Sequence, residues 1–174
     1  MASGKSTVAQ RLAERLPMCV HLRGDVFRRM IVSGRAEMGF ELSEEALAQL
    51  RLRYRIAAEV ARMYLDAGFS VVYQDIIIGR GLAEVIALMP PERLHVVVLC
   101  PSVEAVAARE ARRAKRGYAD SAAVLRFDQV LRTETPPVGL WVDSSALTVE
   151  ETVERILGRL VAMRSCPRSR YDGA

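Results

Sequence analysis

The residues best suited to chemistry stand at the start of the sequence. Ser3-Gly4-Lys5-Ser6-Thr7 matches the second half of the phosphate-loop pattern G-x-x-x-x-G-K-[ST] and runs straight into a helical pattern. In such a loop consecutive backbone N–H groups face an anion, and the positive end of the following helix dipole adds to the attraction. The pattern therefore predicts a polyphosphate site that binds ATP with Mg²⁺.

Each side chain of this loop has an expected role. Lys5 would reach the β and γ oxygens, the Ser6 hydroxyl would bind Mg²⁺, and Thr7 would donate toward the α-phosphate. The leading glycine of the pattern and the strand that normally precedes it fall ahead of residue 1. We therefore expect the first strand to be missing from residues 1–174 and its neighbours in the sheet to be unpaired. The alternative is a chance Gly-Lys-Ser-Thr before a helix.

Alternating strand and helix patterns must position this loop. Apolar, β-branched runs typical of strands buried in a parallel sheet are separated by segments with helical periodicity. The expected strands are 19–22, 69–73, 94–99 and 140–142. The expected helices are 8–16, 26–32, a long one from the N-cap Ser43 to Gly68, one from about 103, 121–131, and one from the Thr148-x-x-Glu151 capping box to about 163. This order predicts an α/β fold, a three-layer α/β/α P-loop NTPase sandwich around a mostly parallel sheet.

Length and composition are those of one globular domain. The chain has 174 residues, 51% hydrophobic and 26% charged. We expect residues 1–164 to form a single domain and residues 165–174 to be a loose tail. Apolar runs stay short of membrane-spanning length and no signal sequence opens the chain, so a cytoplasmic location without membrane contact is expected. Three widely spaced cysteines indicate neither a disulfide framework nor zinc.

Net charge says little about partners. The formal charge is +4 and the pI about 9.2, but only two of the 25 basic residues are lysines, and an arginine-rich chain can simply reflect a GC-rich genome. No aromatic residues interleave the arginines as single-strand binding would favour. Nucleic acid is therefore an unlikely partner by sequence, and the oligomeric state is left open.

With these elements the sequence resembles the small P-loop kinases related to adenylate and shikimate kinase. It is most similar to the chloramphenicol phosphotransferase-like and zeta-toxin-like branch, from Gly4 to about Leu160. The resemblance rests on Ala-Ser-Gly-Lys-Ser-Thr, on Arg-Gly-Asp-Val-Phe-Arg after the second expected strand, on Asp75 after the third, and on the arginine-rich stretch before Val-Asp-Ser-Ser. It implies transfer of the ATP γ-phosphate to a hydroxyl of a small molecule such as an antibiotic or metabolite.

The resemblance also implies an acceptor side. Asp25 matches the family's aspartate that faces the acceptor hydroxyl and would act as base, and Arg28 matches its substrate-gripping arginine. The alternative for Asp25 is a helix N-cap, which is compatible with catalysis. Asp75 ends a parallel strand, where it could hold Mg²⁺ or bind substrate, or simply turn the chain. Arg80 is a weaker candidate for substrate contact.

The family's lid corresponds here to about residues 109–120. Arg109, Arg112, Arg113 and Arg116 follow i, i+3, i+4, i+7 spacing, so one helical face could present them, and Arg109 and Arg116 are the expected catalytic pair. Their alternative is a solvated basic helix face. Asp143 and Ser145 follow the last strand and match the loop that cups the adenine in the family.

Arg51, Arg55 and Arg62 form a row on the long helix that could bind an anionic acceptor or could be a solvated face. Two other functions fit the motif. A regulatory NTPase would bind nucleotide without an acceptor and would not need Asp25. A polynucleotide 5′-hydroxyl kinase would use the basic charge.

Overall fold

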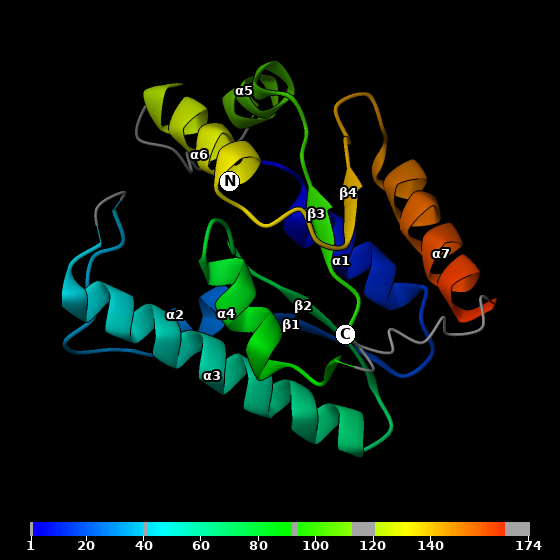
Figure 1. Ribbon diagram of the computed structural model, residues 1–174, viewed down its shortest axis with the longest axis horizontal. Helices are drawn as coiled ribbons and strands as arrows, with labels where there is room; N and C mark the ends of the chain where they lie inside the picture. Colours follow the sequence, from blue (N-terminus) through cyan, green and yellow to red (C-terminus); the bar gives the residue numbers. More distant parts are fainter. Residues whose placement is uncertain (1, 40–41, 92–93, 113–120, 166–174) are drawn as a thin grey trace, which may run out of the picture.

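A computed structural model describes residues 2–39, 42–91, 94–112 and 121–165 of the chain, without the side chains of 121 and 163–165. Helices and strands alternate, as the sequence predicts (Figure 1). Their bounds are α1 Lys5–Glu14, β1 Cys19–Arg23, α2 Gly24–Arg29, α3 Glu44–Asp66, β2 Ser70–Gln74, α4 Gly81–Leu88, β3 Val97–Leu99, α5 Val103–Ala111, α6 Ser121–Thr133, β4 Leu140–Val142 and α7 Val149–Ser165.

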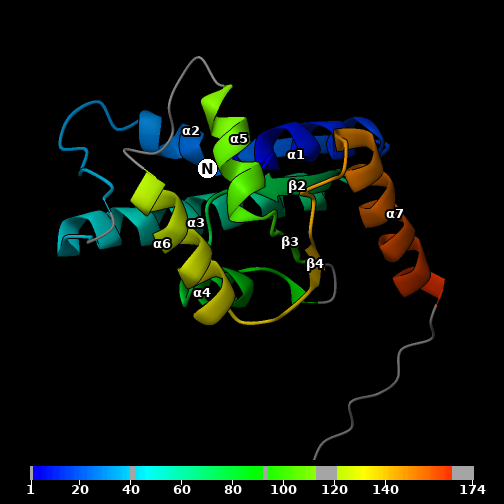
Figure 2. The ribbon, with the colours of Figure 1, turned by 90° about the horizontal axis from the view of Figure 1, so that it is seen from above.

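The elements form three layers. Helices α1 and α7 pack together on one side of the strands, and α3 and α4 lie on the other side, with α3 against both β1 and β2 (Figures 1 and 2). This is the α/β/α sandwich expected from the sequence. Among the described residues no helix combines the length and the apolar character needed to cross a bilayer.

Local signals in the sequence account for several boundaries. The Ser43 hydroxyl accepts a hydrogen bond from the amide of Ala46 at 3.1 Å and so caps α3, which ends just before Gly68 at φ +88°. Thr148 and Glu151 form the predicted capping box, with the Thr148 amide 2.8 Å from a Glu151 carboxylate oxygen and the return bond at 3.2 Å.

One expectation about the elements is wrong. The helix after β1 begins at Gly24 with Arg23 as its N-cap, so Asp25 lies in the first turn and is not the cap. Helix α5 ends at Ala111 with Arg112 as its C-cap. Arg113 and Arg116 lie outside the described residues, so the shared helical face expected of the four arginines stays a prediction.

The strands form two parallel ladders. β1 pairs with β2, with Cys19 opposite Ser70 at one end and Arg23 opposite Gln74 at the other. β3 pairs with β4, with Val97 opposite Leu140 and Leu99 opposite Val142. No ladder joins β2 to β3 within the described ranges, so the expected single sheet is present as two halves. Strand β3 is also shorter than the apolar run 94–99 predicts, since its pairing is set by three-residue β4.

Each half has its own core. Val8 and Leu12 of α1 pack with Val142 of β4 and with Val153 and Ile156 of α7. A second cluster joins Leu22 of β1 to Ala57 and Ala61 of α3. The small alanines let α3 lie close to the strand. Helix α1 also packs against β2 and thereby connects the two halves.

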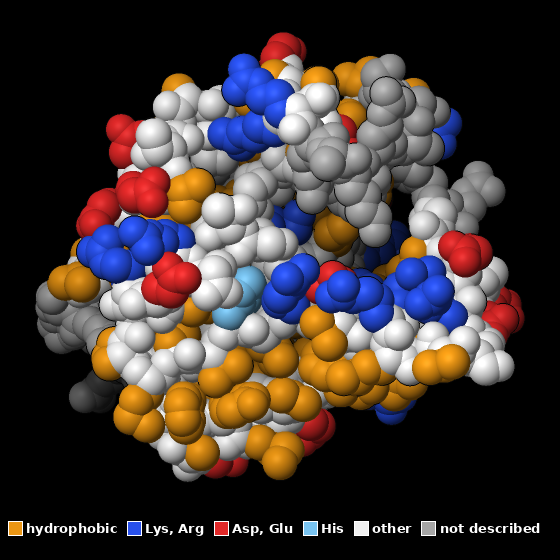
Figure 3. Space-filling view, turned by 180° about the vertical axis from the view of Figure 1, so that it is seen from behind, with side chains coloured by type: hydrophobic (Ala, Val, Ile, Leu, Met, Phe, Trp, Pro, Cys, Tyr) orange, Lys and Arg blue, Asp and Glu red, His pale blue; other side chains and the backbone are white. Residues whose placement is uncertain are grey.

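Surface arginines in several places pair with carboxylates. Lys and Arg side chains form a row across the face in Figure 3, with Asp and Glu among them and a broad hydrophobic area below. Ion pairs on the exposed surface join Arg11 to Glu14, Arg15 to Glu154, Arg51 to Glu84, Arg62 to Glu59, and Arg132 to Asp128. Much of the basic charge is therefore compensated locally.

Candidate active site

The phosphate loop has the backbone geometry that an anion site needs. Gly4 is the N-cap of α1 at φ +86°, a conformation that favours glycine, and its carbonyl accepts the first helical hydrogen bond from Val8 at 2.9 Å. The amides of the first turn of a helix have no acceptor inside the helix, and no acidic residue stands in that turn of α1. The start of α1 can therefore receive a phosphate group.

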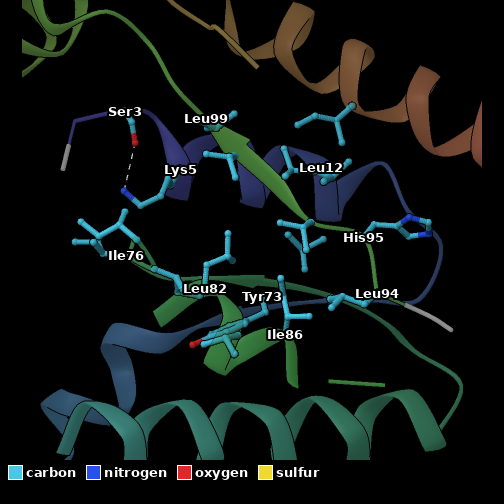
Figure 4. Close-up of a pocket in the computed structure, with 18 of the residues that line it drawn as sticks. Ser3, Lys5, Leu12, Tyr73, Ile76, Leu82, Ile86, Leu94, His95 and Leu99 are labelled. Atoms are coloured by element: carbon cyan, nitrogen blue, oxygen red, sulfur yellow. Dashed lines mark hydrogen bonds between the residues drawn. The ribbon is translucent and has the colours of Figure 1, made fainter. Parts of the chain in front are cut away.

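Two side chains of the loop form hydrogen bonds within the site, and the roles predicted for Lys5, Ser6 and Thr7 stay predictions. The Lys5 ammonium donates to the Ser3 hydroxyl at 3.3 Å, and both residues border a cavity (Figure 4). The exposed Ser6 hydroxyl donates to the side-chain oxygen of Gln74 at 3.0 Å. This bond links the loop to the carboxyl end of β2. Ser6 and Gln74 offer neutral oxygens of the type that Mg²⁺ accepts beside nucleotide phosphates, so the residues present fit that ion.

Asp75 follows Gln74 and is buried, with 4% of its side chain exposed. One carboxylate oxygen accepts from the amide of Ile76 at 2.7 Å and the other from the Tyr73 hydroxyl at 3.2 Å. The Arg53 guanidinium, itself 11% exposed, forms an ion pair with it at 3.0 Å. Both oxygens are therefore engaged by the protein, and the predicted metal or substrate role of Asp75 stays a prediction.

Burial controls the ionisation of this cluster. It raises the pKa of the Asp75 carboxyl, while the charge of Arg53 and the hydrogen bonds from Ile76 and Tyr73 oppose that rise. Burial also raises the pKa of Tyr73, and it raises the pKa of Tyr54 to about 12, so both phenols stay protonated at neutral pH. Arg53 lies 5.8 Å from the centre of the Tyr54 ring, which adds a cation–π contact.

Asp25 stands next to this cluster on the first turn of α2. Its carboxylate pairs with Arg29 at 3.2 Å and with Arg23 at 3.4 Å, and its side chain is 47% exposed. Its charge acts on Asp75, and the preceding Gly24 packs directly against the Asp75 carboxylate. The structure thus brings the two predicted carboxylates together at the carboxyl ends of β1 and β2.

The predicted arginines differ in their surroundings. Arg28 is 27% exposed and donates to the carbonyl of Ala36 at 2.9 Å, with Glu37 at 3.8 Å. Arg80 is exposed at the start of α4. Of the predicted row on α3, Arg51 and Arg62 are held by surface carboxylates and Arg55 is exposed. The inward-facing arginine of this helix is Arg53, which was not part of that row. No sequence signal distinguishes Arg53, because it lies between Arg51 and Arg55 in the same polar pattern.

The predicted adenine loop is well ordered by its own contacts. The carboxylate of Asp143 accepts from both the amide and the hydroxyl of Ser145, and that hydroxyl in turn accepts from the amide of Ser102 at 2.7 Å. Arg109 of α5 donates to the carbonyl of Ser144 at 2.6 Å. Arg109 therefore connects α5 to this loop. The lid and the parts of Arg109 and Arg116 in phosphoryl transfer stay predictions.

Comparison with known proteins adds a family and a fold. The model of a family described as an AAA domain matches residues 1–137, and no curated protein matches the chain. A sugar kinase from a Janibacter species has a similar structure, with 24% sequence identity and a TM-score of 0.68. The match covers 92% of this chain and 89% of the sugar kinase chain. APS kinase from Mycobacterium tuberculosis, solved with AMPPNP and APS, has 17% identity, a TM-score of 0.63 and 92% coverage of both chains. These likenesses establish the P-loop kinase-like α/β fold.

The close packing of Gly24 against the Asp75 carboxylate can be tested by substitution. A Cβ at position 24 would meet the buried Asp75 carboxylate, so Gly24→Ala should lower the free energy of unfolding by about 1–3 kcal/mol, measured by urea denaturation. At Gly158 in α7 a Cβ meets nothing within 4 Å, so Gly158→Ala should stabilise by about 0.5–1 kcal/mol through helix propensity. Equal stabilisation by both changes would contradict the close packing of Gly24 against Asp75.

The buried ion pair gives a second test. Arg53→Met and Asp75→Asn should each destabilise by about 3–5 kcal/mol, because each leaves the other partner buried and uncompensated. The double variant should cost less than the sum of the two single changes. The exposed pair between Arg51 of α3 and Glu84 of α4 is the matched control, for which Arg51→Met and Glu84→Gln should show a coupling below about 1 kcal/mol. Similar couplings in the two cycles would rule out a special role for Arg53.

Proposed function

Because the chain belongs to the AAA domain family, we propose that it is an ATP-dependent phosphotransferase that moves the γ-phosphate to a hydroxyl group of a small molecule. The observation that carries this proposal is that the phosphate loop and Asp25 both lie beside the carboxyl end of β2. The phosphate loop reaches the end of β2 through the Ser6–Gln74 hydrogen bond, and Asp25 stands beside the same strand end through the contact of Gly24 with Asp75. An NTPase without an acceptor would need the first half only.

The nucleotide side would use the start of α1. The amides after Gly4 and the Lys5 ammonium would bind the phosphates, with Thr7 at the α-phosphate. Ser6 would hold Mg²⁺, with Asp75 as the weaker candidate because its oxygens are occupied. When bound, Mg²⁺ neutralises charge on the β and γ oxygens. Asp143 and Ser145 would cup the adenine, and Arg109 would join that loop to the lid.

The acceptor side would use Asp25 as the group that orients the hydroxyl and accepts its proton. Phosphoryl transfer depends mainly on positioning and charge neutralisation, so one fixed carboxylate is sufficient. Arg23 and Arg29 hold the carboxylate of Asp25 from two sides, which limits its rotation. Arg28 and Arg80 would contact the acceptor, and Arg116 would neutralise charge from the lid during transfer.

Two similar structures belong to proteins named as kinases of small molecules, a sugar kinase and APS kinase, which supports this class of acceptor. The resemblance to chloramphenicol phosphotransferase-like and zeta-toxin-like kinases makes antibiotics and UDP-sugars further candidates. The local pairing of surface arginines with carboxylates weighs against a polynucleotide acceptor.

Removal of the loop lysine tests nucleotide binding. Lys5→Ala should weaken ATP affinity by about 10- to 150-fold, the loss expected for one charge-assisted hydrogen bond to phosphate, as measured by isothermal titration calorimetry with MgATP. Arg11→Ala is the control, since it removes an exposed positive charge from the same helix. It should change the affinity less than twofold. Equal effects of the two variants would mean that Lys5 acts only through its general positive charge and does not bind the phosphates directly.

Transfer itself is tested by a mass-spectrometric screen for γ-phosphate on antibiotics, nucleosides, sugars and UDP-sugars. With an acceptor in hand, Asp25→Asn should lower kcat by about 10²- to 10⁴-fold and leave ATP affinity unchanged. Asp66→Asn, at the exposed end of α3, is the control for loss of a carboxylate. Full turnover by the Asp25→Asn variant would refute the assignment of Asp25 as the base. Production of only ADP and phosphate across the screen would favour the regulatory NTPase.

A further inference from the structure

Four polar side chains connect helix α1 to the β1–β2 ladder next to the phosphate loop. Ser6 and Gln10 are four residues apart in α1 and therefore lie on one face of that helix. The Ser6 hydroxyl donates to Oε1 of Gln74 in β2 at 3.0 Å, and Oε1 of Gln10 lies 2.8 Å from Nδ1 of His21 in β1. His21 has no part in the mechanism proposed above, and its place beside Gln74 gives it one.

The hydrogen bonds of this network have a defined direction. The amide nitrogen of Gln10 donates to the Glu14 carboxylate at 3.1 Å, which turns the amide oxygen of Gln10 toward His21. That oxygen can only accept, so Nδ1 of His21 must carry a proton and donate it. A neutral imidazole with its proton on Nδ1 has a lone pair on Nε2. Through Gln10, the carboxylate of Glu14 therefore selects the tautomer of His21.

The second ring nitrogen of His21, Nε2, is buried and has no hydrogen bond of good geometry within the described part of the chain. The Gln74 side chain nevertheless interacts with the ring. Burial and the charge of Arg23 lower the pKa of His21, so the imidazole is neutral at neutral pH. Gln74 and Asp25 oppose this lowering of the pKa without reversing it. Because the Gln74 oxygen is bonded to Ser6, the group of Gln74 that can meet the lone pair on Nε2 is its NH₂ group.

We propose that His21 is a positioning residue for the Mg²⁺–nucleotide site, which binds the NH₂ group of Gln74 and so keeps the Gln74 oxygen turned toward Ser6. This inference rests on the proposed function, because it concerns the hydroxyl proposed there to hold Mg²⁺. A Ser6 hydroxyl that donates to Gln74 keeps its lone pairs for a cation. If the Gln74 amide turned over, its NH₂ group would donate to Ser6 and occupy a lone pair that the ion needs.

The metal-dependent part of nucleotide binding tests this role. ATP affinity is measured by isothermal titration calorimetry with Mg²⁺ and with EDTA, and the ratio of the two affinities is the Mg²⁺ gain. His21→Leu should lower this gain about 3- to 10-fold and leave the affinity in EDTA unchanged. The loss is smaller than the roughly 10- to 100-fold typical for direct partners of metal ligands, because His21 acts through one further side chain. His21→Gln, which places an amide oxygen near the position of Nε2, should restore most of the gain.

His95→Leu is the matched control, the same change at the other histidine of the chain, which Figure 4 places at the end of the cavity away from Ser3 and Lys5. It should leave the Mg²⁺ gain unchanged. An unchanged gain in His21→Leu would overturn the proposal. Equal losses of affinity with Mg²⁺ and with EDTA would also overturn it, because His21 would then only stabilise the fold. A wild-type chain without any Mg²⁺ gain would instead contradict the proposed metal site itself, and this inference with it.

The tautomer of His21 is a second readout, which needs no nucleotide. Nitrogen-15 NMR of the imidazole groups above neutral pH should show the proton of His21 on Nδ1, with the spectrum of His95→Leu assigning the two histidines. Gln10→Leu should remove this preference and lower the Mg²⁺ gain in the same direction as His21→Leu. Because Gln10 is exposed on α1, this variant tests the network even if His21→Leu does not fold. A wild-type proton on Nε2, or an unchanged Mg²⁺ gain in Gln10→Leu, would refute the role of His21.

Discussion

The carboxylate of Asp75 is the group on which the proposed acceptor side depends. It is buried at the end of β2, where a charge would be unfavourable without partners, and two hydrogen-bond donors and the Arg53 guanidinium surround it. The Arg53 guanidinium brings the middle of α3 to the strand end, and Gly24 brings the start of α2 against the same group. The start of α2, which carries Asp25, and the end of β2 therefore meet at one buried side chain.

The nucleotide side depends on backbone geometry instead. A left-handed glycine ends the loop, the first turn of α1 presents its amides, and one side-chain hydrogen bond reaches Gln74. Gln74 and Asp75 are consecutive, so the two sides of the site meet within two residues of β2. A shift of the end of β2 would consequently change both the phosphate loop and the position of Asp25.

Much of this arrangement could be predicted from local sequence signals. Ser43 and the Thr148–Glu151 capping box predicted helix starts correctly, because capping depends only on neighbouring residues. The bounds of β4 were also predicted correctly, because its short apolar run is a local pattern. The position of Arg53 could not be predicted. It lies in a row of arginines, and only the rotation of α3 against β1 and β2 decides which member points inward. The engagement of Asp75 is likewise a result of tertiary packing.

The separation of the sheet links these observations. One core joins α1, β4 and α7, the other joins β1 and α3, and the phosphate loop begins at the boundary between the two. The proposed adenine loop Asp143–Ser145 belongs to the first half, and Asp25, the proposed base, belongs to the second. Transfer of a phosphoryl group from a nucleotide on one half to an acceptor on the other requires their relative position to be held within a fraction of an ångström. Helix α1 packs against β1 and β2 and shares the core of β4 and α7, so the relative position of the two halves depends on how α1 is seated between them.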